Sequence, residues 1–128
     1  MVGIVVVSHS RDIASGVVAL AGQMAGPEVC LAPAGGTPDG GLGTDADRVR
    51  AAIAEADRGD GVIVLGDLGS AFLTARAVLG ASGSNGHVRL VDAPLVEGAV
   101  AAAVTASAGL PLDDVASAAE GTRGAAKL

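Results

Sequence analysis

The sequence predicts one α/β domain, built on an open, mostly parallel, doubly wound sheet of four or five strands with helices on both faces. Its 128 residues are a typical length for a single domain. Short apolar runs such as GIVVV at 3–7 lack alternation, which is typical of strands buried on both faces of a parallel sheet. These runs alternate with segments of helical periodicity, an order that predicts parallel strands joined by helical crossovers.

The expected strands are bounded by turn residues and lie at 3–7, 29–32, 62–65 and 88–91. The first expected helix begins at Ser10 or Asp12, either of which can cap it, and ends before the Gly-Pro pair at 26–27. Its larger apolar residues recur at spacings of four, three and four, which is typical of a core-facing stripe. They are Ile13, Val17, Leu20 and Met24.

The second expected helix has Thr44 as its cap, with Asp47 in the capping-box position, and runs to about residue 58. Further helices are expected at 70–79, 95–108 and 112–119, with a turn-rich loop at 80–86. Residues 121–128 are expected to fray at the end of a single domain that spans 1–128.

Composition excludes several classes of protein. The formal net charge is −6 and Phe72 is the single aromatic residue, so neither a basic surface nor a base-stacking platform for nucleic acid is expected. Apolar stretches are too short to span a membrane, and no basic segment precedes the first one, so a cytoplasmic location is expected. Two histidines and one cysteine, widely spaced, predict no metal site and no intrachain disulfide.

Polar or glycine-rich segments follow each of the four expected strands. These segments lie at 8–10, 34–43, 67–70 and 92–94. In open parallel sheets, ligands bind outside the carboxyl ends of the strands. We therefore expect these four segments to meet at one edge and to form the functional site.

His9 is the main catalytic candidate, because it follows the first strand directly. An imidazole is partly neutral near pH 7, and the neutral ring can attack a phosphoryl group. Its other nitrogen then needs a partner that fixes the tautomer and stabilises the cation formed on phosphorylation. Asp67, which follows the third strand, is expected to be that partner, by the carboxylate–imidazole logic of catalytic triads. The alternative is that Asp67 only caps a helix or forms a turn.

The same edge suits an anion. Gly69 and Ser70 begin a predicted helix, whose free N–H groups and dipole favour phosphate. Gly36 would let backbone amides approach the anion, and Thr37 could donate from its hydroxyl. Arg11 could steer phosphate or an acidic partner. The open alternatives are a flexible surface loop and a solvated arginine.

Other interpretations of the motifs are weaker. His87 falls at the opposite end of the fourth strand and is expected to be structural or at the surface. The Ser-His-Ser triplet at 8–10, with Asp67, suggests a hydrolase, but adjacent residues of an extended segment point to opposite faces and no GxSxG elbow is present. A nucleotide-binding module is disfavoured because neither a phosphate-binding lysine nor a ribose-binding acidic residue can be identified.

Four segments together carry a family resemblance: GIVVVSHS at 3–10, AGGTPDG at 34–40, VLGDLGSA at 64–71 and DAPLVEGA at 92–99. With them, the chain from Gly3 to about Val115 resembles the phosphotransfer subunits of bacterial dihydroxyacetone kinases that work with the phosphoenolpyruvate:sugar phosphotransferase system. Their first domain is similar to mannose-family EIIA domains. Sugar-transport members would show Gly-His-Gly and Gly-Gly-Ser-Pro, where this chain has Ser-His-Ser and Leu-Gly-Ser-Ala. These departures favour the dihydroxyacetone branch.

The resemblance implies a relay without a cofactor. His9 would accept phosphate from the phosphocarrier histidine protein and pass it to ADP on the nucleotide-binding subunit of the kinase. A separate substrate-binding subunit would hold dihydroxyacetone, and Asp67 would orient the imidazole. The candidate phosphate- or partner-binding residues are Ser10, Arg11, Gly36, Thr37, Gly69 and Ser70.

The resemblance also implies a homodimer, for which 95–108 and the fourth strand are candidate contacts. Two alternatives stay open. One is an EIIA component for sugar uptake, and the other is a non-enzymatic regulatory domain of the same fold.

Overall fold

The structure, a computed structural model, describes residues 1–80 and 85–128. These residues form four strands, β1 (Gly3–Ser8), β2 (Leu31–Gly35), β3 (Val62–Gly66) and β4 (Val88–Leu90). They also form the helices α1 (Arg11–Ala25), α2 (Ala46–Ala56), α3 (Gly69–Leu79), α4 (Leu95–Ser107) and α5 (Leu112–Gly121), followed by a 3₁₀ turn at Thr122–Gly124. The predicted loop at 80–86 falls partly outside the described residues.

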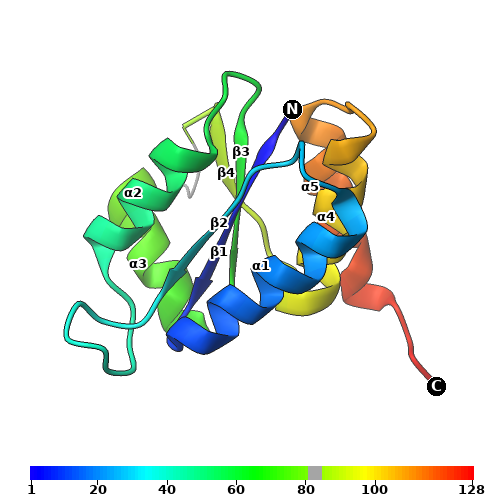
Figure 1. Cartoon of the computed structure of the whole chain (residues 1–128). Coiled ribbons are helices and arrows are strands. Elements are labelled where there is room, and N and C mark those ends of the chain that lie inside the picture. Colours follow the sequence, from blue (N-terminus) through cyan, green and yellow to red (C-terminus); the bar gives the residue numbers. More distant parts are fainter. Residues whose placement is uncertain (81–84) are drawn as a thin grey trace.

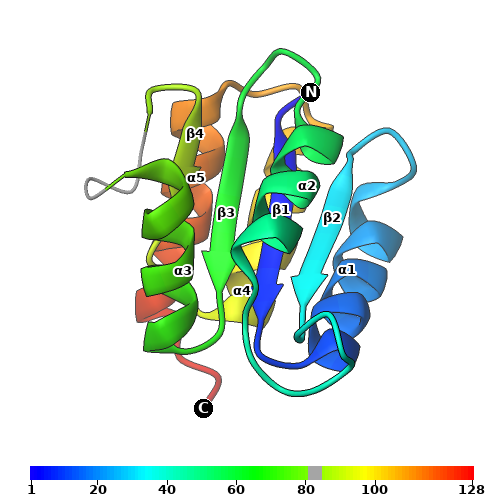
Figure 2. The same ribbon diagram turned by 90° about the vertical axis from the view of Figure 1, so that its left-hand side faces the viewer.

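The strands form one parallel sheet in the order β2-β1-β3-β4. Helices α2 and α3 cover one face, whereas α1, α4 and α5 cover the other (Figures 1 and 2). The predicted α/β class, with its parallel doubly wound sheet, is therefore confirmed. Because all four strands run the same way, the carboxyl ends of β1 and β3 lie together at one edge of the sheet.

The two central strands are buried along their whole length, as their uninterrupted apolar runs predict. The edge strand β2 begins two residues later than expected, at Leu31, and extends to Gly35. It contains Pro33, which is exposed. A proline has no backbone N–H to donate to a neighbouring strand, so it is tolerated in an edge strand. Among the described strands, β2 pairs only with β1.

Small residues set the spacing of the layers. The buried face of α4 consists of Gly98, Ala99, Ala102, Ala103 and Ala106. A Cβ on Gly98 would lie 2.9 Å from the Cβ of Ala93 and 3.4 Å from Leu65, so the helix lies directly against the sheet. The small residues of this face therefore reflect close helix–sheet packing, in a chain with one aromatic residue.

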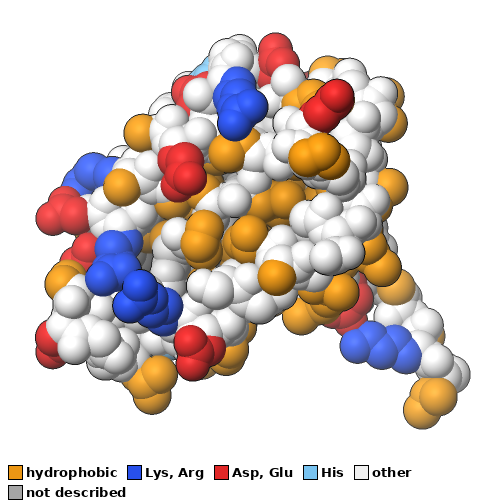
Figure 3. Space-filling view, viewed as in Figure 1, with side chains coloured by type: hydrophobic (Ala, Val, Ile, Leu, Met, Phe, Trp, Pro, Cys, Tyr) orange, Lys and Arg blue, Asp and Glu red, His pale blue; other side chains and the backbone are white. Residues whose placement is uncertain are grey.

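The prediction for the inward face of the first helix was wrong in part. Val17 is buried, but Ile13, Leu20 and Met24 are exposed, by 50%, 44% and 60%. The residues that face the sheet are the smaller Ala14, Val17 and Ala21. Because these small residues let α1 approach closely, the larger apolar stripe is turned toward solvent, and apolar side chains reach the surface in Figure 3.

The helix caps refine the expected boundaries. Of the two candidates for α1, Ser10 is the N-cap, since its hydroxyl accepts from the amide of Ile13. The predicted Thr44 cap of the second helix was wrong, because Asp45 fills that position and accepts from the amide of Arg48. The Thr44 hydroxyl instead bonds the hydroxyl of Thr74 at 2.6 Å, which ties the glycine-rich loop to α3.

We predict that Gly3→Ala destabilises the fold by about 1–3 kcal/mol, as overpacking of a well-packed core does. An added Cβ would lie 2.0 Å from the carbonyl oxygen of Ala56, so β1 or the end of α2 must move. Urea unfolding measures the change. The matched control is Gly16→Ala in α1, where a Cβ meets nothing within 4 Å, and which should stabilise the protein by about 0.5–1 kcal/mol. Equal stability of Gly3→Ala and the parent would contradict the packing described.

Candidate functional site

A polar cluster lies where β1 and β3 end. His9 follows β1, and Asp67 follows β3. The parallel register pairs Val7 with Gly66, so the next residues of each strand come together. The Nδ1 atom of His9 is 2.8 Å from Oδ1 of Asp67. The structure therefore forms the predicted imidazole–carboxylate pair.

The Asp67 carboxylate accepts four hydrogen bonds. Oδ2 accepts from the Ser8 hydroxyl at 2.8 Å and from the His9 amide at 2.9 Å. Oδ1 accepts from the His9 ring and, at 2.7 Å, from the amide of Leu68. Burial raises the pKa of Asp67, but these donors outweigh it and hold the pKa below its ordinary value. The group is thus a carboxylate at neutral pH.

An ionised Asp67 fixes the tautomer of the imidazole. A carboxylate only accepts hydrogen bonds, so His9 must donate from Nδ1, and in the neutral ring the lone pair then resides on Nε2. The Nε2 atom is in close contact with the Ser70 hydroxyl. The His9 side chain is 25% exposed, so this nitrogen is accessible to a reactant at the surface.

Ser70 lies in the first turn of α3, which begins without a side-chain cap. The amides of a helix's first turn have no partner within the helix, and their dipole favours an anion. Gly69 and Ser70 therefore present a helix N-terminus and a hydroxyl next to the free nitrogen of His9. An anionic group bonded to Nε2 would find hydrogen-bond donors there.

The row formed by Asp67, His9 and Ser70 has the connectivity of a hydrolase triad, although not with the serines considered from the sequence. Ser8 bonds Asp67 rather than the imidazole, and Ser10 caps α1. Both hydroxyls are thus engaged away from His9 Nε2.

Ser8 is the site residue that sequence reasoning missed. It is fully buried, and it is the one buried polar side chain among the described residues. Its position in the last place of a buried strand, directly before His9, was the signal that could have revealed it. A hydroxyl is found at such a place only where it has a partner.

The glycine-rich loop is held mainly by its own hydrogen bonds. The amide of Gly36 donates to the Ser8 carbonyl at 3.3 Å, and that of Gly43 to the His9 carbonyl at 2.8 Å. The Thr37 hydroxyl bonds Asp39 and accepts from Gly41, and the Thr37 hydroxyl, followed by the Gly41 amide, holds the pKa of Asp39 below its ordinary value. The structure thus places Gly36 and Thr37 beside the site, with these groups used within the loop, and their predicted contact with phosphate stays a prediction.

Close approach explains one glycine of this loop. A Cβ on Gly35 would lie 2.6 Å from the carbonyl oxygen of Ser10 and 2.9 Å from Cα of Arg11. The first turn of α1 therefore packs directly on the end of β2. Arg11, two residues after His9, is exposed at this turn.

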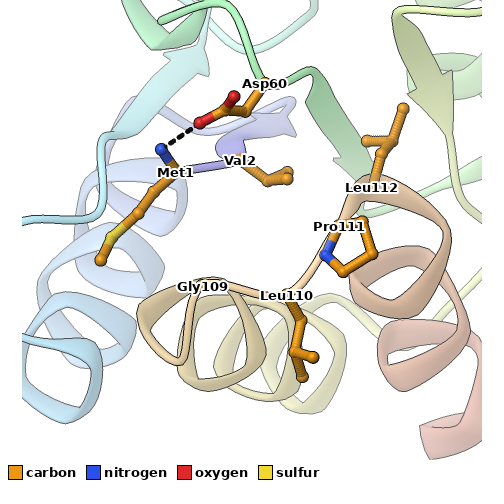
Figure 4. Close-up of a pocket in the computed structure, with 7 residues that line it drawn as sticks. All are labelled: Met1, Val2, Asp60, Gly109, Leu110, Pro111 and Leu112. Atoms are coloured by element: carbon orange, nitrogen blue, oxygen red, sulfur yellow. Dashed lines mark hydrogen bonds and ion pairs between the residues drawn. The ribbon is translucent and has the colours of Figure 1, made fainter.

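A hollow of about 370 Å³ lies away from this site, lined by Met1, Val2, Asp60 and 109–112 at the amino end of the sheet (Figure 4). His87 is also at that end, with Nε2 2.8 Å from Asp57. Residues 1–80 and 85–128 hold no cluster of metal-binding side chains and no helix long and apolar enough to cross a membrane.

We predict that Asp67→Asn lowers the free energy of unfolding at pH 7 but not in acid. Because folding lowers the pKa of Asp67 below 3.8, its ionised form stabilises the fold above that pH, and this contribution is lost as the pH falls through the lowered pKa. Urea unfolding at pH 7 and at decreasing acid pH measures the difference between variant and parent. Asp114→Asn at the surface is the matched control, expected within about 0.5 kcal/mol. If the difference in free energy of unfolding between Asp67→Asn and the parent does not decrease in acid, the stabilising role of the Asp67 charge is contradicted.

Comparison with known proteins identifies the family and the fold. A family model for mannose-type EIIA domains, described as "PTS system fructose IIA component", matches residues 3–116. A crystal structure described as "unknown function protein EF1359" superposes with a TM-score of 0.84 at 37% identity, covering 99% of this chain and 98% of that one. The fold and its topology are thus shared with a solved protein.

The similar curated proteins are phosphoryl donor subunits. One from Escherichia coli K12, "PEP-dependent dihydroxyacetone kinase, phosphoryl donor subunit DhaM", is 43% identical over 120 residues, which is 90% of this chain but 25% of the relative. A counterpart from Listeria innocua is 42% identical over 79% of this chain and 78% of its own length. The chain thus spans about a quarter of the longer relative and matches most of the shorter one. By these matches, the chain belongs to the mannose-type EIIA family, among the DhaM proteins.

Proposed function

We propose that this domain relays phosphoryl groups through a phosphohistidine formed on Nε2 of His9. One observation carries the proposal: Asp67 binds the Nδ1–H of His9, so the lone pair of the partly exposed ring lies on Nε2, which contacts the Ser70 hydroxyl. In the step proposed, a bond forms between Nε2 and phosphorus while the donor's bond to phosphorus breaks. The proton on Nδ1 stays in its hydrogen bond to Asp67.

The surroundings of Nε2 suit both directions of transfer. The positive charge that develops on the ring is next to the Asp67 carboxylate, and the Ser70 hydroxyl and the amides of the first turn of α3 can donate to phosphoryl oxygens. Transfer between two proteins depends mostly on positioning and on charge stabilisation. A small rigid domain with one nucleophile supplies both.

Exposed leucines favour a protein, rather than a small molecule, as the partner at this site. Leu68, next to Asp67, is 63% exposed, and Leu42 is 82% exposed. Leu42 precedes Gly43, whose amide bonds the His9 carbonyl. Apolar side chains exposed on segments that adjoin a nucleophile indicate a surface that a partner covers, which would also exclude water during transfer.

The partners proposed follow from the family resemblance of the sequence; the relatives' names themselves give phosphoenolpyruvate and dihydroxyacetone kinase. The donor is the phosphocarrier histidine protein of the phosphotransferase system, with phosphoenolpyruvate as the original source. The acceptor is ADP on the nucleotide-binding subunit of dihydroxyacetone kinase, which acts with the substrate-binding subunit. We also propose that residues 1–128 act as one domain, in the cytoplasm, as a homodimer.

We predict that the protein gains one acid-labile phosphoryl group when it is incubated with phosphoenolpyruvate and the two general phosphotransferase proteins. Intact-mass spectrometry before and after mild acid measures it. His9→Ala should not be labelled. His87→Ala, which removes the histidine at the opposite edge, should be labelled like the parent. Ser70→Ala should carry phosphate of the same acid lability, though more slowly. Acid-stable label, or label on His9→Ala, would contradict the phosphohistidine.

A second prediction concerns the acceptor. Isolated phosphorylated protein, mixed with both kinase subunits, ADP and dihydroxyacetone, should lose its label and produce dihydroxyacetone phosphate, detected by an enzyme-coupled assay. The control omits ADP and should leave the label in place. The kinase subunits are first shown to work with another phosphoryl donor subunit. If these subunits then form no dihydroxyacetone phosphate with this protein, the result favours the sugar-uptake or regulatory alternative.

A further inference from the structure

We propose that Ser8 is a positioning residue of this site, which holds the Asp67 carboxylate in place so that Asp67 fixes His9 in its reactive tautomer. The proposal concerns how the proposed phosphohistidine is prepared, and it therefore rests on that function. It adds a residue that does not touch the reacting nitrogen and acts through its neighbour.

The hydrogen bonds of Ser8 form a directed chain. The amide of Ser10 donates to the Ser8 hydroxyl oxygen at 3.0 Å, and the Ser8 hydroxyl donates to Oδ2 of Asp67 at 2.8 Å. The other carboxylate oxygen, Oδ1, accepts from the His9 ring. Because the Ser10 amide already donates to Ser8, the proton of the hydroxyl is left for Asp67.

This series of hydrogen bonds begins at the N-terminus of α1. Ser10 is the N-cap of α1, so Ser8 joins the start of that helix to the end of β3. The carboxylate is gripped on Oδ2 by Ser8 and by the His9 amide, which restricts its rotation. Oδ1 is thereby presented to Nδ1 of His9.

Burial makes this contact sensitive to change. Ser8 is 0% exposed, and its register partner on β2 is Gly35, against which the first turn of α1 packs. Water has no access to replace the lost hydroxyl, so Ser8→Ala leaves Asp67 with one fewer donor and the Ser10 amide without its acceptor. Among the described residues, His9 is the titratable group in contact with Asp67, and it is therefore the group that responds.

The test uses the unphosphorylated protein first. In Ser8→Ala, the pKa of the Asp67 carboxyl, measured by NMR titration, should rise by roughly one pH unit, since a donor to the charged form is lost. The ring ¹⁵N chemical shifts of His9 near neutral pH should change from values typical of the Nδ1–H tautomer to values typical of a mixture of the two tautomers. The control Thr105→Val, which removes a hydroxyl bonded within α4, should move neither signal. Unchanged titration and unchanged tautomer in Ser8→Ala would overturn the proposal.

Transfer kinetics supply the second measurement. Ser8→Ala should accept phosphate roughly tenfold more slowly, as expected when a catalytic group loses its orientation. In an Asp67→Asn background, the same substitution should have little further effect, because Ser8 acts through Asp67. Additive losses in the double variant would overturn the coupling. If no variant and not even the parent is phosphorylated, the proposed function fails, whereas the NMR titrations still decide the role of Ser8.

Discussion

The Asp67 carboxylate is the point on which the site depends. It joins two strand ends, since it accepts the hydroxyl of Ser8 and the amide and ring of His9 across the boundary between β1 and β3. These donors keep it ionised despite its partial burial. This one carboxylate thus joins the ends of β1 and β3 and holds the proton of the neutral imidazole on Nδ1.

The parallel sheet makes this arrangement possible at low structural complexity. The two central strands are buried on both faces and end in register, so residues that are distant in sequence meet without long loops. Small residues on α1 and α4 let both helices lie close to the sheet. Close packing is also why the larger side chains of α1, such as Ile13 and Met24, are left toward solvent.

The glycine-rich loop supports the site more by geometry than by the phosphate cradle that its composition suggests. Its amides bond within the loop or to the carbonyls of Ser8 and His9, and Thr37 uses its hydroxyl on Asp39. The start of α3, which has no side-chain cap, is the part of the site that we propose to donate to an anion. Composition could not distinguish these two roles, because hydrogen-bond partners of a loop are set by its folded path.

The sequence by itself determined the fold class, the order of elements and the pairing of His9 with Asp67, because buried parallel strands have a plain apolar pattern and a shared carboxyl edge. Only the tertiary structure decided the start of β2, the cap of α2 and the buried face of α1, which depend on packing distances that small residues permit. It also decided that Nδ1 of His9 faces Asp67 and that the buried Ser8 hydroxyl donates to the same carboxylate. Those follow from a few hydrogen bonds between neighbouring strand ends, and no periodicity in the chain encodes their direction.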